Sequence, residues 1–123
     1  MNVGDVFAWK RTFTEDEIRL FGKVSGDEGI HHIQTDEHGR LMAQGLFTAT
    51  LPAKIGGDLN FVAREMTFNF LRPVYENDTI ECQVTITDLR EVREIMNASS
   101  SWRCLNQRGK EVMRGHATGI IRR

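Results

Sequence analysis

The chain has 123 residues, with 16 basic and 17 acidic side chains, a net charge of −1 at pH 7 and 40% hydrophobic residues. This length suits one domain with one core, so we expect residues 1–123 to form a single domain. The balanced charge argues against a nucleic-acid-binding protein, and no apolar run approaches the roughly 20 residues needed to span a bilayer. The N-terminus lacks a basic segment followed by an apolar one, so we expect no signal peptide and a cytoplasmic location.

The first third of the chain predicts a strand and then a helix. Residues 6–13 alternate loosely between apolar and polar side chains, as a short strand does. Thr14 and Glu17 have the spacing of a capping box, in which each side chain bonds the backbone amide of the other. Apolar residues then recur on one helical face, and Gly26 is a suitable stop. We therefore expect a helix over residues 15–24.

The middle of the chain predicts a polar loop followed by a buried helix. Residues 26–42 contain three glycines and many titratable side chains, which is typical of a loop. Residues 43–56 are mostly apolar or small on every face, as in a helix that is covered all round. Pro52 predicts a kink or a shortening of this helix, and Gly56-Gly57 is its expected end.

Everything after Asn60 predicts antiparallel strands. Alternating segments at 66–72 and 80–87 are separated by a turn at 76–78, and two long segments at 92–105 and 110–122 are joined by a tight turn that ends in Gly109. The buried helix needs a cover, and the sheet is the available partner. We therefore predict an α+β fold in which a curved antiparallel β-sheet wraps around a central α-helix.

The cysteine content predicts reduced thiols. Cys82 and Cys104 are too few for a disulfide framework and form no CxxC pair, and both lie in strand-like segments. We expect two free thiols in or beside the sheet.

The loop at 26–42 holds the candidate acid–base groups. Asp27 precedes His32 by five residues, directly after a helix, and a turn between them could bring a carboxylate and an imidazole together, with Gly29 supplying a positive backbone angle. Two plainer interpretations stay open: an Asp that only bonds nearby amides, and solvated histidines. A metal site formed by this loop lacks any recognised ligand spacing; its ligands would be His31, His32, Asp36, Glu37 and His38.

Several spaced motifs give the chain a family resemblance. Residues 25–32 read SGDEGIHH, residues 43–47 read AQGLF, and the run from Phe68 to Pro73-Val74 and then Asn77-Asp78-Thr79 follow in order. In this order they resemble the MaoC-like, or (R)-specific enoyl-CoA hydratase (hydratase 2), family of hot-dog proteins, with its S-G-D-x-N-P-[IL]-H, A-H-G-[ML], F-x-x-P-V and G-D-T runs. The resemblance covers about residues 6–87. Gly29-Ile30 replaces the usual Asn-Pro, and Gln44 replaces a frequent histidine.

The resemblance implies a hot-dog fold and a role in fatty acid metabolism, with hydration or dehydration of acyl thioesters carried by coenzyme A or an acyl carrier protein. By motif position, Asp27 and His32 would be the catalytic dyad, with His31 as the alternative histidine. The Gly45 amide would form the oxyanion hole at the start of the central helix, where the helix dipole aids it. The residues expected at the substrate are Gly29, Gln44, Phe47 and Phe70. The resemblance implies no metal or organic cofactor. It does imply a homodimer or a higher homo-oligomer.

Two other functions stay open. On the same fold, Asp27 could direct water at the thioester carbonyl, which would make the protein an acyl-CoA thioesterase. Alternatively, Gly29-Ile30 and Gln44 could mark a degraded site in a non-catalytic acyl-CoA-binding module. Arg64, Arg72 and the Arg122-Arg123 tail are candidates for contacts with phosphate groups of coenzyme A or a carrier protein, although solvated charge is the simpler interpretation.

Overall fold

A computed structural model describes residues 1–122, so Arg123 of the basic tail lies outside the described residues. Strand β1 (Val6–Thr12) is followed by helices α1 (Glu15–Ser25), α2 (Ile30–Ile33), α3 (Gly45–Thr48) and α4 (Thr50–Asp58). Four longer strands complete the chain, namely β2 (Phe61–Phe70), β3 (Thr79–Val92), β4 (Ile95–Leu105) and β5 (Glu111–Ile121). None of the helices in residues 1–122 is both long and apolar enough to cross a membrane.

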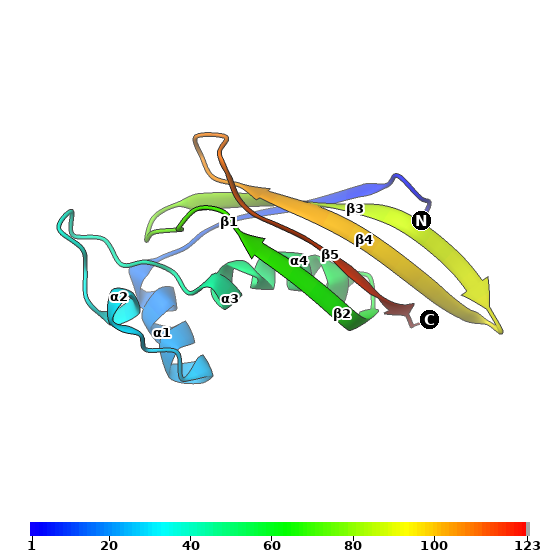
Figure 1. Ribbon diagram of the computed structural model, residues 1–123, viewed down its shortest axis with the longest axis horizontal. Coiled ribbons are helices and arrows are strands. Elements are labelled where there is room, and N and C mark those ends of the chain that lie inside the picture. The colour runs from blue at the N-terminus through cyan, green and yellow to red at the C-terminus, as the bar shows by residue number, and fades with distance from the viewer. Residues whose placement is uncertain (123) are drawn as a thin grey trace.

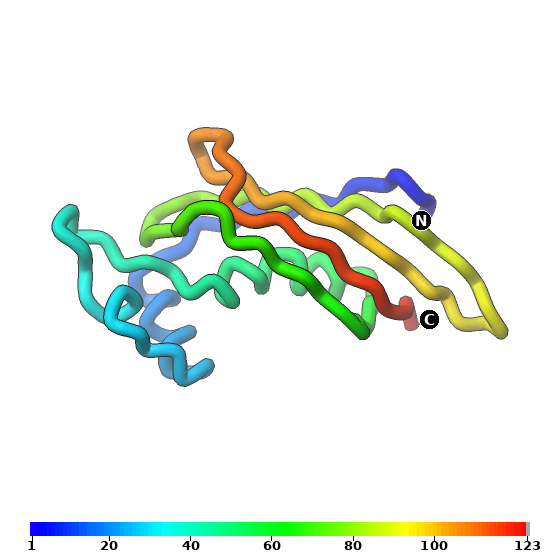
Figure 2. The backbone as a smooth tube through the Cα atoms, in the orientation of Figure 1, coloured from blue at the N-terminus to red at the C-terminus, as the bar shows by residue number. Residues whose placement is uncertain are grey.

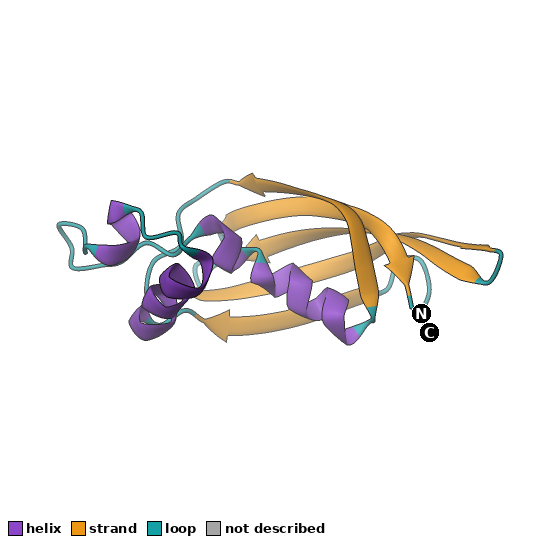
Figure 3. Ribbon diagram, turned by 90° about the horizontal axis from the view of Figure 1, so that it is seen from below, coloured by secondary structure: helices purple, strands orange, loops and turns teal. Residues whose placement is uncertain are grey.

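The strands form one antiparallel sheet in the order β1-β3-β4-β5-β2. The sheet curves around α3 and α4, which lie along its concave side, whereas α1 and α2 lie at one end (Figures 1 and 3). Strand β3 shows which face of the sheet is inward, because Ile80, Cys82, Val84 and Ile86 alternate as its buried residues. The predicted fold class, a curved antiparallel sheet around a central helix, is confirmed.

Helix α1 follows the local signals of the sequence. The Thr14 side chain accepts a hydrogen bond from the Glu17 amide, and the Glu17 carboxylate accepts one from the Thr14 amide, which completes the capping box. Gly26 ends the helix in the left-handed region at φ 81°. The predicted helix and its stop are confirmed, one residue longer than expected.

The central helix is broken, and the break lies before Pro52. Helix α3 ends at Thr48, Ala49 adopts a turn, and α4 begins at Thr50. Pro52 has no N–H to donate to the Thr48 carbonyl four residues earlier, so the helical ladder is interrupted at that turn. This break agrees with the predicted kink or shortening of the helix at Pro52. The predicted end is wrong, because Gly56 and Gly57 lie inside α4, which runs to Asp58.

Two segments differ from the expected loop and strand boundaries. The loop at 26–42 contains the helical turn α2, which carries both adjacent histidines. Strand β2 begins at Phe61, and β3 continues to Val92, where Arg93 and Glu94 (φ 54° and 67°) form a two-residue turn into β4. Turns of this type normally use glycine or asparagine, so Arg93 and Glu94 carry no residue-type signal for a turn. The tip of this hairpin projects past both termini (Figure 2).

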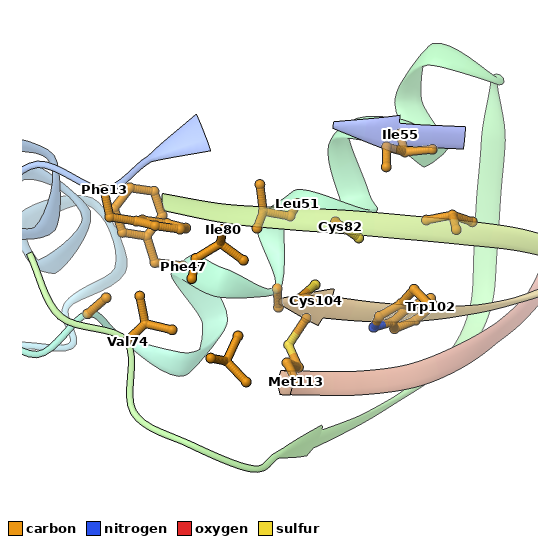
Figure 4. Close-up of a cluster of buried hydrophobic side chains, with 14 of the residues drawn as sticks. Phe13, Phe47, Leu51, Ile55, Val74, Ile80, Cys82, Trp102, Cys104 and Met113 are labelled. Atoms are coloured by element: carbon orange, nitrogen blue, oxygen red, sulfur yellow. The ribbon is translucent and has the colours of Figure 1, made fainter. Parts of the chain in front are cut away.

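The core lies between the sheet and α3–α4 (Figure 4). Phe47 is packed edge-on against Phe13, with ring centroids 4.7 Å apart, and is stacked on Phe21 at 4.8 Å. Cys82 and Cys104 are directly opposite each other on β3 and β4, and both are fully buried free thiols. Both thiols lie in the sheet, as predicted.

Candidate active site

Asp27 and His32 come together where the chain leaves α1. Gly26 reverses the backbone, and α2 then places the His32 ring opposite the Asp27 carboxylate, with Nε2 of His32 3.6 Å from Oδ2 of Asp27. The Asp27 amide donates to the Ser25 hydroxyl at 3.0 Å, and Asp27 Oδ1 accepts a hydrogen bond from the Gly29 amide at 3.4 Å. The carboxylate is therefore held by its own loop and remains about half exposed.

The backbone fixes the orientation of the His32 ring. Nδ1 of His32 lies 2.7 Å from the carbonyl oxygen of Met42. A carbonyl can only accept, so Nδ1 carries a proton and Nε2 is the ring nitrogen that faces Asp27. His32 is buried, whereas His31 is exposed with its ring centroid 3.9 Å from that of His32. The structure thus pairs His32, not His31, with Asp27.

Gly29 has a different structural role from the one expected. Its φ is −53°, so it does not supply a positive backbone angle; Gly26 does. A Cβ at position 29 would lie 3.2 Å from Cε1 of His31 and 3.6 Å from both Asp27 Oδ1 and His32 Cδ2. Only the His31 contact would be tighter than ordinary van der Waals contact, so glycine here leaves room for the His31 ring.

An open cavity of about 390 Å³ begins at His32 and continues to β2. Its lining includes His31, Met42, Gly45, Thr48, Phe70 and Arg72. The Gly45 amide is in the first turn of α3, where amides have no intrahelical acceptor. A Cβ at this position would lie 2.9 Å from Cε1 of Phe70, so the Phe70 ring rests directly on the Gly45 backbone.

Two residues expected at the substrate have buried side chains outside this cavity. The Phe47 side chain is enclosed by Phe13 and Phe21 in the core. The Gln44 side chain is completely buried and bonds the carbonyls of Ile18 and Asp27. The structure therefore does not place these two side chains at the cavity, because Gln44 and Phe47 turn inward as α3 begins, whereas Leu46 between Gly45 and Phe47 points outward.

A second, apolar cavity of about 140 Å³ lies deeper between α4 and the sheet. Pro52, Ala53 and Gly56 line its helix side, and Met66 and Trp102 are among the residues on its sheet side. Phe68 lines neither cavity, and its ring lies 6.2 Å from Phe70 and 5.5 Å from Trp102. The two cavities thus follow one another along the concave side, with Phe68 between them.

The remaining titratable groups of the 26–42 loop hold the loop itself. Asp36 accepts hydrogen bonds from the amides of Arg40 and His38 and from the Arg40 guanidinium. The Arg40 amide is the main reason that the pKa of Asp36 lies below its ordinary value. No group of three or more His, Cys, Asp or Glu side chains placed to hold a metal ion occurs in residues 1–122.

Sequence reasoning missed Met42, whose backbone carbonyl orients His32. It also missed Thr48 and the position of Arg72 at the cavity, where the Arg72 guanidinium donates to the Glu111 carbonyl at 2.6 Å. A carbonyl contact has no residue-type signature, so only the fold could reveal the role of Met42. Phe70, which the family resemblance placed at the substrate, lines the cavity and is half exposed.

Comparisons with known proteins agree with this fold. Residues 40–93 match the thioesterase superfamily. A curated relative, the mitochondrial 3-hydroxyacyl-[acyl-carrier-protein] dehydratase FERN of Solanum lycopersicum, is 26% identical over 98% of this chain and 78% of its own length. Among solved structures, the R-hydratase PhaJ1 of Pseudomonas aeruginosa superposes with a TM-score of 0.88 at 22% identity, covering 98% of this chain and 82% of that one. The (R)-hydratase of A. caviae gives 0.87 at 22% identity, covering 99% and 98%. These matches confirm the hot-dog fold.

Proposed function

We propose that this hot-dog protein, similar in fold to (R)-hydratases and in sequence to a 3-hydroxyacyl-[acyl-carrier-protein] dehydratase, is an acyl-thioester hydratase/dehydratase. It would add water reversibly to a trans-2-enoyl thioester to give the (R)-3-hydroxyacyl thioester, a hydro-lyase reaction. The observation that carries the proposal is the Asp27–His32 pair, 3.6 Å apart, beside a cavity that also exposes the Gly45 backbone.

The proposed dyad activates one water molecule. Asp27 Oδ2 and His32 Nε2 are both acceptors close enough to share a water. Nε2 takes one proton as the water oxygen bonds to Cβ, and the resulting imidazolium is stabilised by the Asp27 carboxylate. The same Nε2–H then returns a proton to Cα, so hydroxide and proton are both delivered and the protein ends unchanged. These steps need no metal or organic cofactor.

The Gly45 amide is the proposed donor to the thioester oxygen. Negative charge accumulates on that oxygen as the enolate forms, and a fixed N–H stabilises it. Helix α3 is a single turn separated from α4, so the amide itself supplies this stabilisation and little macrodipole aligns behind it. The half-exposed Phe70 ring, which rests on Gly45, is the proposed floor beneath the thioester.

The apolar cavity is the proposed site for the end of a longer acyl chain. From Gly45 to Ala53 the helical segments advance about 12 Å at about 1.5 Å per residue, which is more than a crotonyl group can reach. A longer chain would pass Phe68 and place its terminal carbons beside Ala53, Gly56 and Met66. The exposed guanidinium of Arg72 at the outer cavity suits a phosphate of coenzyme A or of an acyl carrier protein.

A homodimer is part of the proposal. Strand β2 is the last strand of the sheet, so one of its edges is unpaired in the single chain. Leu46, Val62 and Phe70, at and beside this edge, are at least partly open to solvent, with exposed fractions of 62%, 46% and 53%. An unpaired edge with exposed apolar side chains suits pairing with a second copy, which would also cover the proposed site.

The cytoplasmic location also stays a proposal. The free thiols of Cys82 and Cys104 suit a reducing compartment, whereas the tomato relative carries the word mitochondrial in its name. Cell fractionation with an antibody against the full chain would separate the two compartments; recovery in mitochondria would refute the cytoplasmic assignment.

The test is hydration of crotonyl-CoA and 2-octenoyl-CoA by the full chain, measured as the loss of absorbance of the conjugated double bond. Asp27→Asn and His32→Ala should each lower kcat by about 10²- to 10⁴-fold with the fold retained. Asp16→Asn on α1 and His38→Ala in the exposed part of the loop are matched controls that should keep wild-type rates. Full activity in either dyad variant would refute the assignment.

A thioesterase is the second candidate, favoured by the match of residues 40–93 to the thioesterase superfamily. It would hydrolyse the thioester and release coenzyme A with a free thiol, and the carbon–carbon double bond of the acyl group would remain. Thiol detection in the same assay therefore distinguishes the two reactions. Saturable binding of acyl-CoA without either product would indicate the non-catalytic module instead.

A further inference from the structure

Gln44 precedes the proposed oxyanion residue, and its side chain points away from the cavity. The side chain has an exposed fraction of 0%. Nε2 donates to the carbonyl of Ile18 at 3.0 Å and to the carbonyl of Asp27 at 3.4 Å. Carbonyl oxygens only accept, so the NH₂ end of the amide must face them and the orientation of the side chain is fixed.

Through Gln44, these two bonds join helix α1, the Asp27 backbone and the start of α3. Ile18 belongs to α1, and Asp27 is the first half of the dyad. The Gln44 carbonyl accepts from the amides of Phe47 and Thr48 at 3.0 and 3.2 Å, so the same residue begins α3 immediately before Gly45. The position of Asp27 relative to the Gly45 amide is therefore set through one buried side chain.

Helix α1 is shaped to admit this amide. Gly22 lies where Gln44 approaches, and a Cβ there would lie 3.2 Å from the Asp27 oxygen and 3.3 Å from Gln44 Nε2. Gly22 is helical and has no positive φ, so the close approach of Gln44, and not the backbone angles, explains why position 22 is a glycine. Two positions far apart in sequence thus serve the same contact.

We infer that Gln44 is a positioning residue that sets the distance between the Asp27 carboxylate and the Gly45 N–H. Its kinetic consequence rests on the proposed function, because the Asp27 group and the Gly45 amide act on opposite parts of one substrate. Since displacement of a catalytic group by about 1 Å can cost about 100-fold in rate, loss of this contact should lower kcat strongly. KM for crotonyl-CoA should change much less, because Gln44 touches no substrate.

Two variants at position 44 test the donor itself. Gln44→Met keeps the length and removes the NH₂ group, and kcat should fall by about 10- to 100-fold at every pH. Gln44→Glu places an oxygen where the donor was. A carboxylate repels both carbonyls, whereas a protonated carboxyl can donate to one of them. The ratio of Gln44→Glu to wild-type kcat should therefore rise as the pH falls, while the ratio for Gln44→Met stays flat.

Gly22→Ala separates positioning from stability. Alanine favours helix over glycine, so α1 itself is strengthened while the new methyl group pushes on Asp27 and Gln44. We expect an unchanged or higher Tm with a several-fold lower kcat. Gly57→Ala, at a helical position with open space around it, is the matched control and should keep wild-type kcat. Ile80→Val, a fully buried core change away from the contact, should lower Tm without lowering kcat.

Hydrogen exchange of the segment 26–33 gives a readout independent of activity. In Gln44→Met the amides of this segment should exchange faster than in the wild type, and in Ile80→Val they should not. If wild-type protein fails to hydrate enoyl-CoA, the proposed function is refuted while this measurement still decides the inference. Unchanged exchange in Gln44→Met, wild-type kcat in Gln44→Met and Gly22→Ala, or an effect confined to KM would each overturn the positioning role.

Discussion

Filling the apolar cavity should shorten the acyl chain that the protein accepts. Gly56 lines this cavity from α4, and a Cβ there would make only ordinary contact, 3.6 Å from Cδ1 of Phe61. A Gly56→Leu side chain can therefore enter the cavity without displacing backbone. Glycine is about 1 kcal/mol less favourable than alanine inside a helix, so the substitution should not lower the Tm.

The expected size of the effect follows from the cavity volume. A cavity of about 140 Å³ is close to the roughly 150 Å³ apolar cavity that accommodates a benzene ring, so it holds about six carbons. Leucine would occupy the space of about four of them. Each buried methylene contributes about 0.8 kcal/mol, so a long-chain substrate would lose about 3 kcal/mol, or about 100- to 200-fold in kcat/KM.

The assay compares kcat/KM for crotonyl-CoA, 2-octenoyl-CoA and 2-dodecenoyl-CoA. Gly56→Leu should leave crotonyl-CoA nearly unchanged and lower the dodecenoyl value by about 100-fold. Gly57→Leu is the matched control, because it makes the same change one residue along on α4 in open space. Equal losses on all three substrates, or no loss on the longest one, would refute the placement of the acyl chain in this cavity.

Three further predictions concern the edge strand, the loop and the oxyanion site. Val62→Lys on β2 should convert the proposed dimer to a monomer in sedimentation, because an edge lysine opposes strand pairing; an unchanged dimer would place the interface elsewhere. The lowered pKa of Asp36 means that its charged form stabilises the folded state above its ordinary pKa of 3.8, and that this contribution disappears as the pH falls through the lowered value. Urea unfolding should therefore show Asp36→Asn less stable than wild type at neutral pH, with the gap closing in acid; a gap independent of pH contradicts this. Gly45→Ala keeps the backbone N–H but should push the Phe70 ring aside and lower kcat on crotonyl-CoA by about 100-fold, whereas a wild-type kcat would show that the contact of the Phe70 ring with Gly45 does not position the substrate.

Local signals in the sequence predicted the elements that local chemistry determines. The Thr14–Glu17 capping box and the Gly26 stop lie within a few residues of the bonds they make, so α1 could be predicted with its ends. The strand alternation around Cys82 identified the inward face of β3 because one face is buried. The pairing of Asp27 with His32 was likewise predictable as a candidate, since both lie in one short loop.

The remainder depends on contacts between distant segments. The family resemblance placed Gln44 at the substrate, yet its side chain turns inward and bonds the Ile18 carbonyl of α1. His32 is oriented by the backbone carbonyl of Met42, and a backbone carbonyl is present in every residue, so the residue type does not indicate this contact. The Arg93-Glu94 turn uses residues that rarely adopt positive φ, and the long β3–β4 ladder on both sides compensates for it.

The reactivity of Cys82 and Cys104, which face each other on β3 and β4, can report the separation of these two strands. The hydrogen bond to Cys82 and burial raise the pKa of the Cys104 thiol, so the reactive thiolate is scarce while β3 and β4 stay paired. An alkylating reagent therefore labels this protein only when the strands separate. Labelling rates measured over a range of reagent concentrations would yield the frequency of that separation without any added probe.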